Sequence, residues 1–519
     1  MLTGLSAGRY RIHPALPGYL ADWWRRDDPG NHDAVREAAT RTLLAAYAAL
    51  GVLLDKQISS GNAGFVYALI TLERRTMGGL LGYALDHGLW HEAIWIASPL
   101  DQYWKARGLD EEATAWADRA RLATEGPDGT PPPLDTHEGA LWLFFVGTQA
   151  RRELEGHHLD DAERTYQQLL AMLRAQPASP QQQRHLATCY QQLGEVAHDR
   201  GRLDDAEGWY RKALAVAEEL GDKSGIAPSY HMFGRVAQRR GRLDDAEQWY
   251  RKALAIREEL GNAPDMVAIF HQLGMVAQHG GRLDDAEEWY HKALAVVEEL
   301  GDEPGKAAIY HQLGNIAQDR GLLDDAEEWY RKALAIKEEL GDESGLVSTY
   351  HQLGIIAFLW GRLDDAEEWC RKALAIAEEV GNEPDKAAIY HQLGRVAQDR
   401  GQLEDAEQWY RKSLAIKEEL GDEPGMATTF GQLGRLAEEQ GQPRQALEWM
   451  VRSVALFGEF PHPATGPAPD YLARLTVQLG TGALEQCWQQ VTGHPLPPAV
   501  RSYLASSQAH GRQWKGNAS

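Results

Sequence analysis

Residues 311–350 read HQLGNIAQDRGLLDDAEEWYRKALAIKEELGDESGLVSTY, and this 40-residue unit recurs along the chain. Seven copies run from about residue 183 to residue 457 without an insertion, and each repeats one tryptophan and one glycine at the same positions: Trp209, Trp249, Trp289, Trp329, Trp369, Trp409 and Trp449; Gly194, Gly234, Gly274, Gly314, Gly354, Gly394 and Gly434. A degenerate unit precedes them, because LDDAE at residues 159–163 repeats at residues 203–207, a spacing of 44. Self-similarity at a fixed period of this length indicates a solenoid of stacked units.

Each unit contains two predicted helices. Leu313, Ile316 and Ala317 form one apolar helical stripe, and Gly321 ends it. Asp324 with Glu327 three residues later has the spacing of a capping box, which predicts the start of the second helix. Gly341 is placed to end that helix, because glycine accepts a left-handed conformation. A single pair of helices cannot bury these faces, so neighbouring units must stack.

Charge and cysteine content exclude several classes of protein. The 519 residues contain 53 Lys and Arg and 76 Asp and Glu, a net charge of −23, which argues against a nucleic-acid partner. Three separated cysteines predict neither a disulfide framework nor a cysteine zinc site. We find no apolar stretch that approaches a membrane span and no signal peptide, so we expect a cytoplasmic protein with no membrane partner.

The repeat pattern resembles the tetratricopeptide repeat family, in the long variant found in kinesin light chains and bacterial signalling proteins. The residues that carry the resemblance in one copy are Tyr310, Leu313, Gly314, Ala317, Gly321, Ala326, Tyr330 and Ala333. The resemblance implies an all-α fold, a right-handed superhelical solenoid of helical hairpins. It also implies a concave groove lined by the first helix of each unit.

The N-terminal region resembles a different family, the signal-transduction ATPases with numerous domains. YRIHPALP at residues 10–17 is similar to the end of their winged-helix region, and later residues are similar to the helical arm that follows it: Glu73, Leu81, Trp90, Tyr103, Trp104, Arg107, Gly108 and Glu112. The sequence contains no GxxxxGK[ST] phosphate loop, so the resemblance implies a sensor arm without its ATPase.

Turn-rich segments suggest the domain boundaries. GPDGTPPP at residues 126–133 separates an N-terminal helical region, residues 1–133, from the repeat array at residues 137–460. A proline-rich break at residues 461–469 begins a C-terminal helical cap, residues 461–507, and we expect a flexible tail at residues 508–519.

The candidate binding site is a series of polar residues that precede the Leu-Gly pair. Histidine recurs at what we call the ladder position, occupied by His231, His271, His311, His351 and His391. Glutamine follows it at Gln272, Gln312, Gln352 and Gln392. Both side chains can donate and accept hydrogen bonds, so a periodic peptide backbone could be matched unit by unit. The alternative is that duplication copied a solvated face that binds no ligand.

The position four residues after the ladder position varies between copies: Arg235, Asn315, Ile355, Arg395 and Arg435. In the fifth copy Phe358 and Leu359 replace a polar pair, and with Ile355 they predict an exposed apolar hot spot for a partner. The alternative for these three residues is that another part of the chain covers them. We expect the ladder histidines to have unperturbed pKa values near 6.5 and to gain charge as pH falls from about 7.5 to about 5.5, which would strengthen binding of an acidic peptide.

The sequence contains no HExxH, GxSxG or CxxC motif, and we expect no catalysis, no metal and no cofactor. The predicted function is a protein- or peptide-binding repeat scaffold, a sensor or regulatory arm in bacterial-type signalling. Two alternatives stay open: a receptor for a small signalling peptide or metabolite, and the sensor subunit of a split signalling ATPase.

Overall fold

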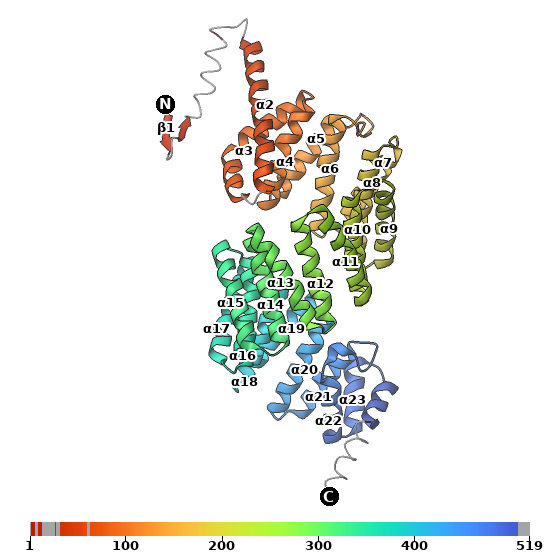
Figure 1. Ribbon diagram of the computed structural model, residues 1–519. Coiled ribbons are helices and arrows are strands. Elements are labelled where there is room, and N and C mark those ends of the chain that lie inside the picture. Colours follow the sequence, from red (N-terminus) through yellow and green to blue (C-terminus); the bar gives the residue numbers. More distant parts are fainter. Residues whose placement is uncertain (1, 6–8, 13–25, 27–31, 60–62, 507–519) are drawn as a thin grey trace. The chain divides into compact units, whose positions relative to one another are not determined.

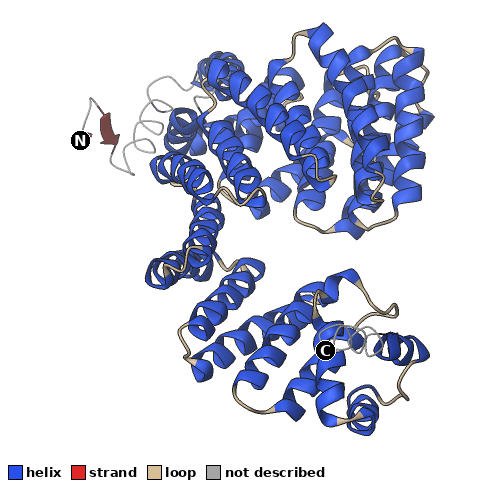
Figure 2. Ribbon diagram, turned by 60° about the horizontal axis from the view of Figure 1, so that its bottom comes forward, coloured by secondary structure: helices blue, strands red, loops and turns tan. Residues whose placement is uncertain are grey.

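The computed structural model describes residues 2–5, 9–12, 26, 32–59 and 63–506. Almost all of these residues are helical (Figures 1 and 2), which confirms the predicted all-α solenoid. A short antiparallel hairpin precedes the helices, in which strand β1 (Leu2–Leu5) pairs with strand β2 (Arg9–Ile12). Residues 13–17 of the predicted winged-helix-like segment and the tail predicted at residues 508–519 lie outside the described residues.

The array consists of alternating first and second helices. The degenerate unit contains α6 (His137–Glu155) and α7 (Leu159–Ala175). The first helices of the seven regular repeats are α8 (Pro180–Asp199), α10 (Lys223–Arg239), α12 (Ala263–His279), α14 (Glu303–Asp319), α16 (Glu343–Leu359), α18 (Glu383–Asp399) and α20 (Glu423–Glu439). The second helices are α9 (Leu203–Glu219), α11 (Leu243–Leu260), α13 (Leu283–Leu300), α15 (Leu323–Leu340), α17 (Leu363–Val380), α19 (Leu403–Leu420) and α21 (Pro443–Ala455).

The flanks are helical as well. Among the described residues from 32 onwards, four helices precede the array: α2 (His32–Ser59), α3 (Ala63–Asp86), α4 (Trp90–Ala106) and α5 (Asp110–Thr124). A 3-10 turn η1 (Pro463–Thr465), α22 (Ala468–Leu479), α23 (Thr481–Thr492) and a helical segment at residues 498–506 follow it. The chain forms two compact units, residues 1–262 and 263–519, so the division falls inside the array.

Local sequence explains where the helices begin and end, with one correction. The Asp302 side chain caps α14 by accepting a 3.0 Å hydrogen bond from the Gly305 amide, and Gly341 ends α15 with φ 66°. The capping box predicted at Asp324 is wrong, because α15 begins at Leu323 and has no side-chain cap. Glu327 instead accepts a 2.8 Å bond from Arg331 and a 2.6 Å bond from Arg362.

Glycine allows the two helices of a repeat to pack closely. A Cβ atom on Gly314 would lie 2.6 Å from Cε1 of Tyr330, a separation that real Cβ atoms do not adopt. Tyr330 is fully buried over this glycine, so the small residue on α14 makes room for the large one on α15. Gly314 therefore has a packing role.

The recurring tryptophans pack between an aromatic ring and a lysine. Trp329 lies 5.5 Å, centroid to centroid, from Tyr310 of the same repeat, and Lys332 Nζ lies 4.1 Å above its ring. Trp369 packs against the core of the preceding repeat, which contains Tyr330. The tryptophan series therefore serves packing, as its position in the repeat predicts.

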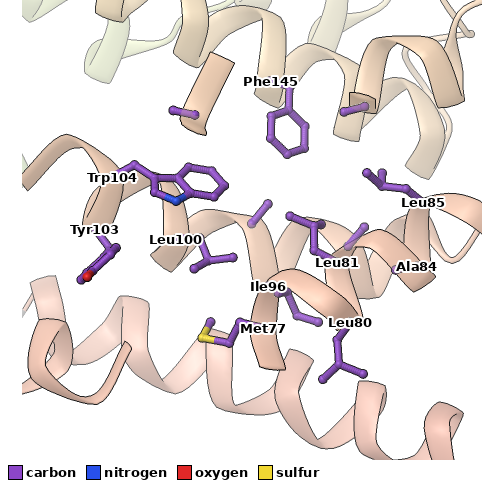
Figure 3. Packing of buried hydrophobic residues seen from close by; sticks show 14 of the residues in the cluster. Met77, Leu80, Leu81, Ala84, Leu85, Ile96, Leu100, Tyr103, Trp104 and Phe145 are labelled. Atoms are coloured by element: carbon purple, nitrogen blue, oxygen red, sulfur yellow. The ribbon is translucent and has the colours of Figure 1, made fainter. Parts of the chain in front are cut away.

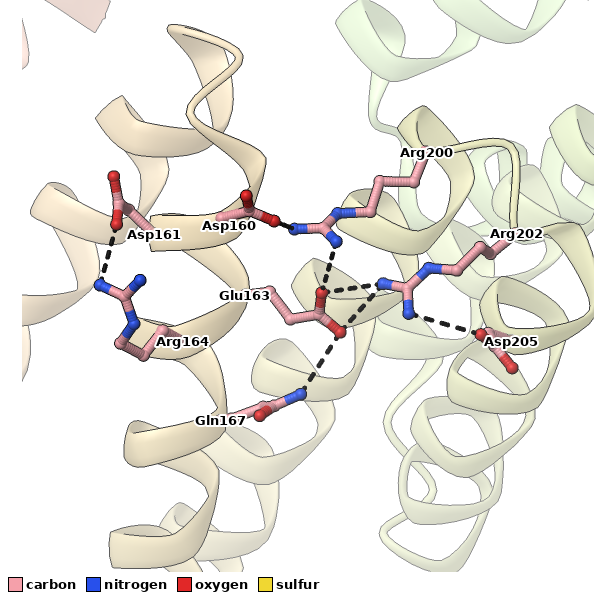
Figure 4. A network of polar contacts seen from close by, with 8 residues as sticks. All are labelled: Asp160, Asp161, Glu163, Arg164, Gln167, Arg200, Arg202 and Asp205. Carbon is pink, nitrogen blue, oxygen red and sulfur yellow. Dashed lines mark hydrogen bonds and ion pairs between the residues drawn. The ribbon is translucent and has the colours of Figure 1, made fainter.

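Ion pairs join consecutive repeats at the turn between the first and the second helix. Glu163 of α7 contacts Arg200 at 3.2 Å and Arg202 at 2.9 Å, and Asp160 also pairs with Arg200 (Figure 4). Equivalent pairs recur in later repeats: Arg240 with Glu207, Arg320 with Glu287, and Arg400 with Glu367. Three repeats depart from this series, because Gly280, Trp360 and Gln440 stand at the position of these arginines.

The N-terminal helices enclose an aromatic and aliphatic core. Met77 and Leu81 of α3, Trp104 of α4 and Phe145 of α6 are all buried there (Figure 3). Helix α2 packs on α3 and α4. By length and composition α2 is nevertheless apolar enough to cross a membrane, with a window inside Asp33–Ile58 of mean hydropathy 1.3 that is 22% buried. The expectation that no stretch approaches a membrane span is therefore wrong for this helix.

Candidate functional site

The predicted site residues lie on the first helices of the repeats. His231 and Arg235 are on α10 of the first compact unit, and the remaining residues are on α12, α14, α16, α18 and α20 of the second unit. Within each repeat the helix brings the ladder position and the residue four positions later onto one face.

The ladder histidines pack on the tyrosines of their own second helices. The rings lie 5.3–5.8 Å apart, centroid to centroid, in four pairs: His231 with Tyr250, His271 with Tyr290, His311 with Tyr330, and His391 with Tyr410. All five histidines are half-buried. Histidine at this position therefore has a folding role that the sequence pattern did not reveal.

Burial also changes how these histidines titrate. Desolvation lowers the pKa of His271, lowers the pKa of His311 and of His351 to about 4, and lowers that of His391 to about 3. The buried amines of Lys337 and Lys417 act in the same direction on the pKa of His311 and His391, respectively. The expectation that the ladder gains charge between pH 7.5 and 5.5 is wrong for His311, His351 and His391, because these three rings stay neutral there.

Three polar atoms, at the ladder position or on the glutamine that follows it, are buried and have no hydrogen-bond partner among the described residues. They are Nδ1 of His311, Oε1 of Gln352 and Nε2 of Gln392, in consecutive repeats. Buried polar groups in folded proteins nearly always have partners, so each such atom calls for an explanation. Because these atoms are buried, the Gln352 and Gln392 side chains would have to rotate before a ligand could reach their amide groups.

The residues four positions after the ladder make several different contacts. Asn315 accepts a 2.7 Å bond from the Tyr330 hydroxyl and donates a 3.1 Å bond to Gln312. Arg235 is paired with Glu195 at 2.6 Å. Arg395 and Arg435 each donate to a glutamine on the same helix, Gln392 at 3.1 Å and Gln432 at 3.4 Å.

The apolar group in the fifth repeat is only partly exposed. Phe358 is half-buried, packs against a small core that contains Val396, and lies 4.3 Å from the guanidinium carbon of Arg395. Ile355 is half-buried, and Leu359 is 48% exposed. The expectation that all three side chains face water together is therefore wrong, because Phe358 and Ile355 are partly covered by the chain itself.

Two buried lysines belong to the same region and were missed in the sequence. Lys337 is 7% exposed and donates a 2.8 Å bond to the Thr349 hydroxyl of the next repeat. Lys417 makes the equivalent 2.9 Å bond to Thr429, whose hydroxyl lies 3.3 Å from Nδ1 of His391. The sequence contains a signal for these lysines, because two neighbouring repeats carry apolar pairs at the equivalent positions: Val297 with Ile309 in the preceding repeat, and Ala377 with Ile389 in the repeat between them.

Family models match the array. A MalT-like TPR region matches residues 229–380, and a tetratricopeptide repeat model matches residues 185–259, 345–419 and 385–459. Residues 185–459 are tetratricopeptide repeats. No protein of curated function matches the chain.

Solved structures share the tetratricopeptide repeat fold at low sequence identity. The apo form of the quorum sensor NprR from B. thuringiensis is 12% identical, with a TM-score of 0.51, and the match covers 74% of this chain and 99% of that one. BtubC from P. vanneervenii is 24% identical, with a TM-score of 0.38, over 45% of this chain and 92% of that one. A signal transduction ATPase with numerous domains from Pyrococcus horikoshii, which carries a tetratricopeptide repeat sensor, is 14% identical, with a TM-score of 0.45, over 73% of this chain and 55% of that one. These likenesses concern the fold alone.

Proposed function

We propose that the chain is a non-catalytic scaffold that binds an extended segment of a protein or peptide along the first helices of its tetratricopeptide repeats. The observation that carries the proposal is the row of buried polar atoms without partners at His311, Gln352 and Gln392. An extended peptide has an amide donor and a carbonyl acceptor on every residue. Such a ligand would supply the missing hydrogen bonds at intervals.

The finer role is a sensor or regulatory arm in cytoplasmic signalling of the bacterial type. The NprR structure is that of a quorum sensor, and a signalling ATPase with a tetratricopeptide repeat sensor shares the helical fold. A partner ATPase supplied by another chain is part of this proposal, since the sequence contains no phosphate loop. The apolar side chain of Leu359 and the guanidinium of Arg435, both exposed, would lie at the edge of the bound segment.

Selection from a displayed library of random 12-residue peptides tests this proposal. Peptides that bind the full chain are synthesised, and their affinities are measured by fluorescence anisotropy for the wild type and for a variant with Gln312→Ala, Gln352→Ala and Gln392→Ala. Loss of three hydrogen-bonding side chains should weaken binding about tenfold or more.

A matched control variant carries Glu328→Gln and Glu368→Gln, two exposed positions on the second helices. It should bind the selected peptides as the wild type does. Peptides that bind the glutamine-deficient variant with unchanged affinity would show that the first helices of these repeats are not the binding surface.

A further inference from the structure

The ladder position carries glycine at both ends of the array. It is Gly431 in the last repeat and, 44 residues before Gln191, Gly147 in the degenerate unit. No side chain or distant backbone lies within 4 Å of where a Cβ would stand on either glycine. Glycine destabilises the interior of a helix relative to alanine, so helix packing gives no reason for it here. Each glycine leaves open space at the position that Gln191 occupies in the first regular repeat and histidine in the next five.

An arginine follows each of these glycines by four residues, Arg151 on α6 and Arg435 on α20. Residues spaced by four lie on the same face of a helix, so each guanidinium stands one turn from the open space. Neither arginine is paired with a carboxylate among the described residues, although the chain has 76 acidic residues against 53 basic ones. The neighbouring charges of α4 are already paired, Asp101 with Arg152 and Lys105 with Glu155.

The larger open space is a cavity of about 800 Å³ inside the first compact unit. Gly147 and Arg151 line it together with apolar side chains of α6 and α7, chiefly Phe144, Leu169 and Leu173. A volume of this size is typical of sites that bury a small organic ligand. The charged groups on its wall are Asp101, Lys105 and Arg151, which leaves one positive charge in excess. The cavity at Gly431 is smaller, about 320 Å³.

We propose that the cavity at Gly147 is a second binding site, separate from the peptide-binding face of the later repeats, and that it takes a ligand with an apolar group and a single carboxylate. The carboxylate accepts hydrogen bonds from the Arg151 guanidinium, whose planar fork matches a carboxylate in bidentate fashion. The apolar group lies over Gly147 and contacts Phe144 and the leucines of α7. A monoanion suits the single excess charge, whereas a phosphate group carries nearly two negative charges.

The ligand chemistry could belong to a small organic acid or to the free C-terminus of a polypeptide, and paired probes distinguish them. The small-acid probes are 1-naphthylacetate and its neutral amide, and the peptide probes are acetyl-Ala-Leu-Phe with a free or an amidated C-terminus. Isothermal titration calorimetry of the full chain should show that at least one acid binds about tenfold or more tightly than its amide, because a hydrogen bond to a charged group is lost in the amide.

Three variants locate the site. Arg151→Gln should abolish the preference for the acid over the amide. Gly147→Leu should abolish binding of both and leave the thermal unfolding midpoint unchanged or higher, because leucine is the better helix former and a Cβ atom at this position meets no atom within 4 Å. Arg164→Gln, a control at an exposed arginine of α7 that does not line the cavity, should leave the binding of all four probes unchanged. The proposal is overturned if no probe binds at millimolar concentration, or if Arg151→Gln keeps the acid preference. Neither result bears on peptide binding by the later repeats, which is tested with other residues.

Discussion

The hydroxyl of Tyr330 on α15 bonds Oε1 of Gln318 on α14 at 3.0 Å, and it shares its one proton between that oxygen and Oδ1 of Asn315 at 2.7 Å. The same bond joins Tyr250 to Gln238 at 3.0 Å and Tyr410 to Gln398 at 2.9 Å. In the fifth repeat both partners are replaced, by Phe358 at the glutamine position and Cys370 at the tyrosine position. A cysteine side chain is too short to reach an acceptor on the facing helix. With Cys370 in place of tyrosine, no hydroxyl needs an acceptor, so phenylalanine can replace glutamine at position 358. The two departures from the repeat are therefore one structural change.

A double-mutant cycle tests this coupling. Phe358→Gln alone should destabilise the protein, because it replaces a half-buried ring by an amide without its donor, and Cys370→Tyr alone should crowd Phe358. Together they restore the arrangement of the fourth repeat and should recover about 1 kcal/mol or more relative to the sum of the single changes. Urea unfolding of the wild type, the two single variants and the double variant measures this coupling free energy. Strictly additive changes in stability would show that the two positions are independent.

The ladder histidines should make the protein less stable as pH falls. Burial lowers the pKa of His311 and His351 to about 4, below the value near 6.5 expected in the unfolded chain. Between these values the unfolded state binds a proton that the folded state does not, so each ring contributes stability above pH 6.5 that is lost as pH falls towards 4. The slope is about 1 kcal/mol per pH unit for each histidine.

Urea unfolding at pH 7, 6 and 5 follows this loss. A variant with His311→Gln and His351→Gln should show a smaller decrease in stability over the same range. Peptide binding should be nearly independent of pH between 7.5 and 5.5 as far as these rings are concerned. An equal decrease in both proteins would mean that other groups cause the pH dependence.

Two glycine-to-alanine substitutions should change the stability of the protein in opposite directions. Gly314→Ala would place a Cβ atom 2.6 Å from the Tyr330 ring, and such overpacking costs about 1–3 kcal/mol. Gly431→Ala meets no atom within 4 Å and should stabilise α20 by up to about 1 kcal/mol through helix propensity. Thermal unfolding midpoints of the two variants compare them directly. A destabilising Gly431→Ala would contradict the open space described at that position.

Lys337 and Thr349 should be replaceable without loss of stability only if both are replaced together. Thr349→Ile alone removes the hydroxyl that accepts the 2.8 Å bond, and the ammonium keeps only the Gly345 carbonyl at 3.1 Å, a loss of about 1–3 kcal/mol. Lys337→Val combined with Thr349→Ile reproduces the apolar pair Val297 and Ile309 of an earlier repeat and should be at least as stable as the wild type. Guanidinium unfolding measures the stability of the wild type, of Thr349→Ile and of the double variant. A double variant weaker than Thr349→Ile alone would show that the lysine stabilises the interface by other means.

Sequence periodicity was sufficient to predict the helices of the array and their packing. The 40-residue spacing places Gly314 opposite Tyr330 and Gly341 at the end of a helix, and these features depend on local geometry that every copy repeats. The capping box at Asp324 failed, because the same residues also fit the first turn of a helix whose acids pair with arginines of the next repeat.

The candidate site depended on contacts that periodicity does not contain. A histidine that recurs every 40 residues predicts a row of exposed side chains. Only the facing helix shows that His311 packs on Tyr330 and is too buried to titrate near neutral pH. The cavity at Gly147 likewise needs α4, α6, α7 and α8 together, and α4 lies outside the repeat pattern. The sequence by itself therefore determined the repeating architecture, because hydrogen bonds and apolar stripes within each hairpin are local. Tertiary structure decided which polar groups are buried, paired or left open, because that depends on residues brought together from different helices.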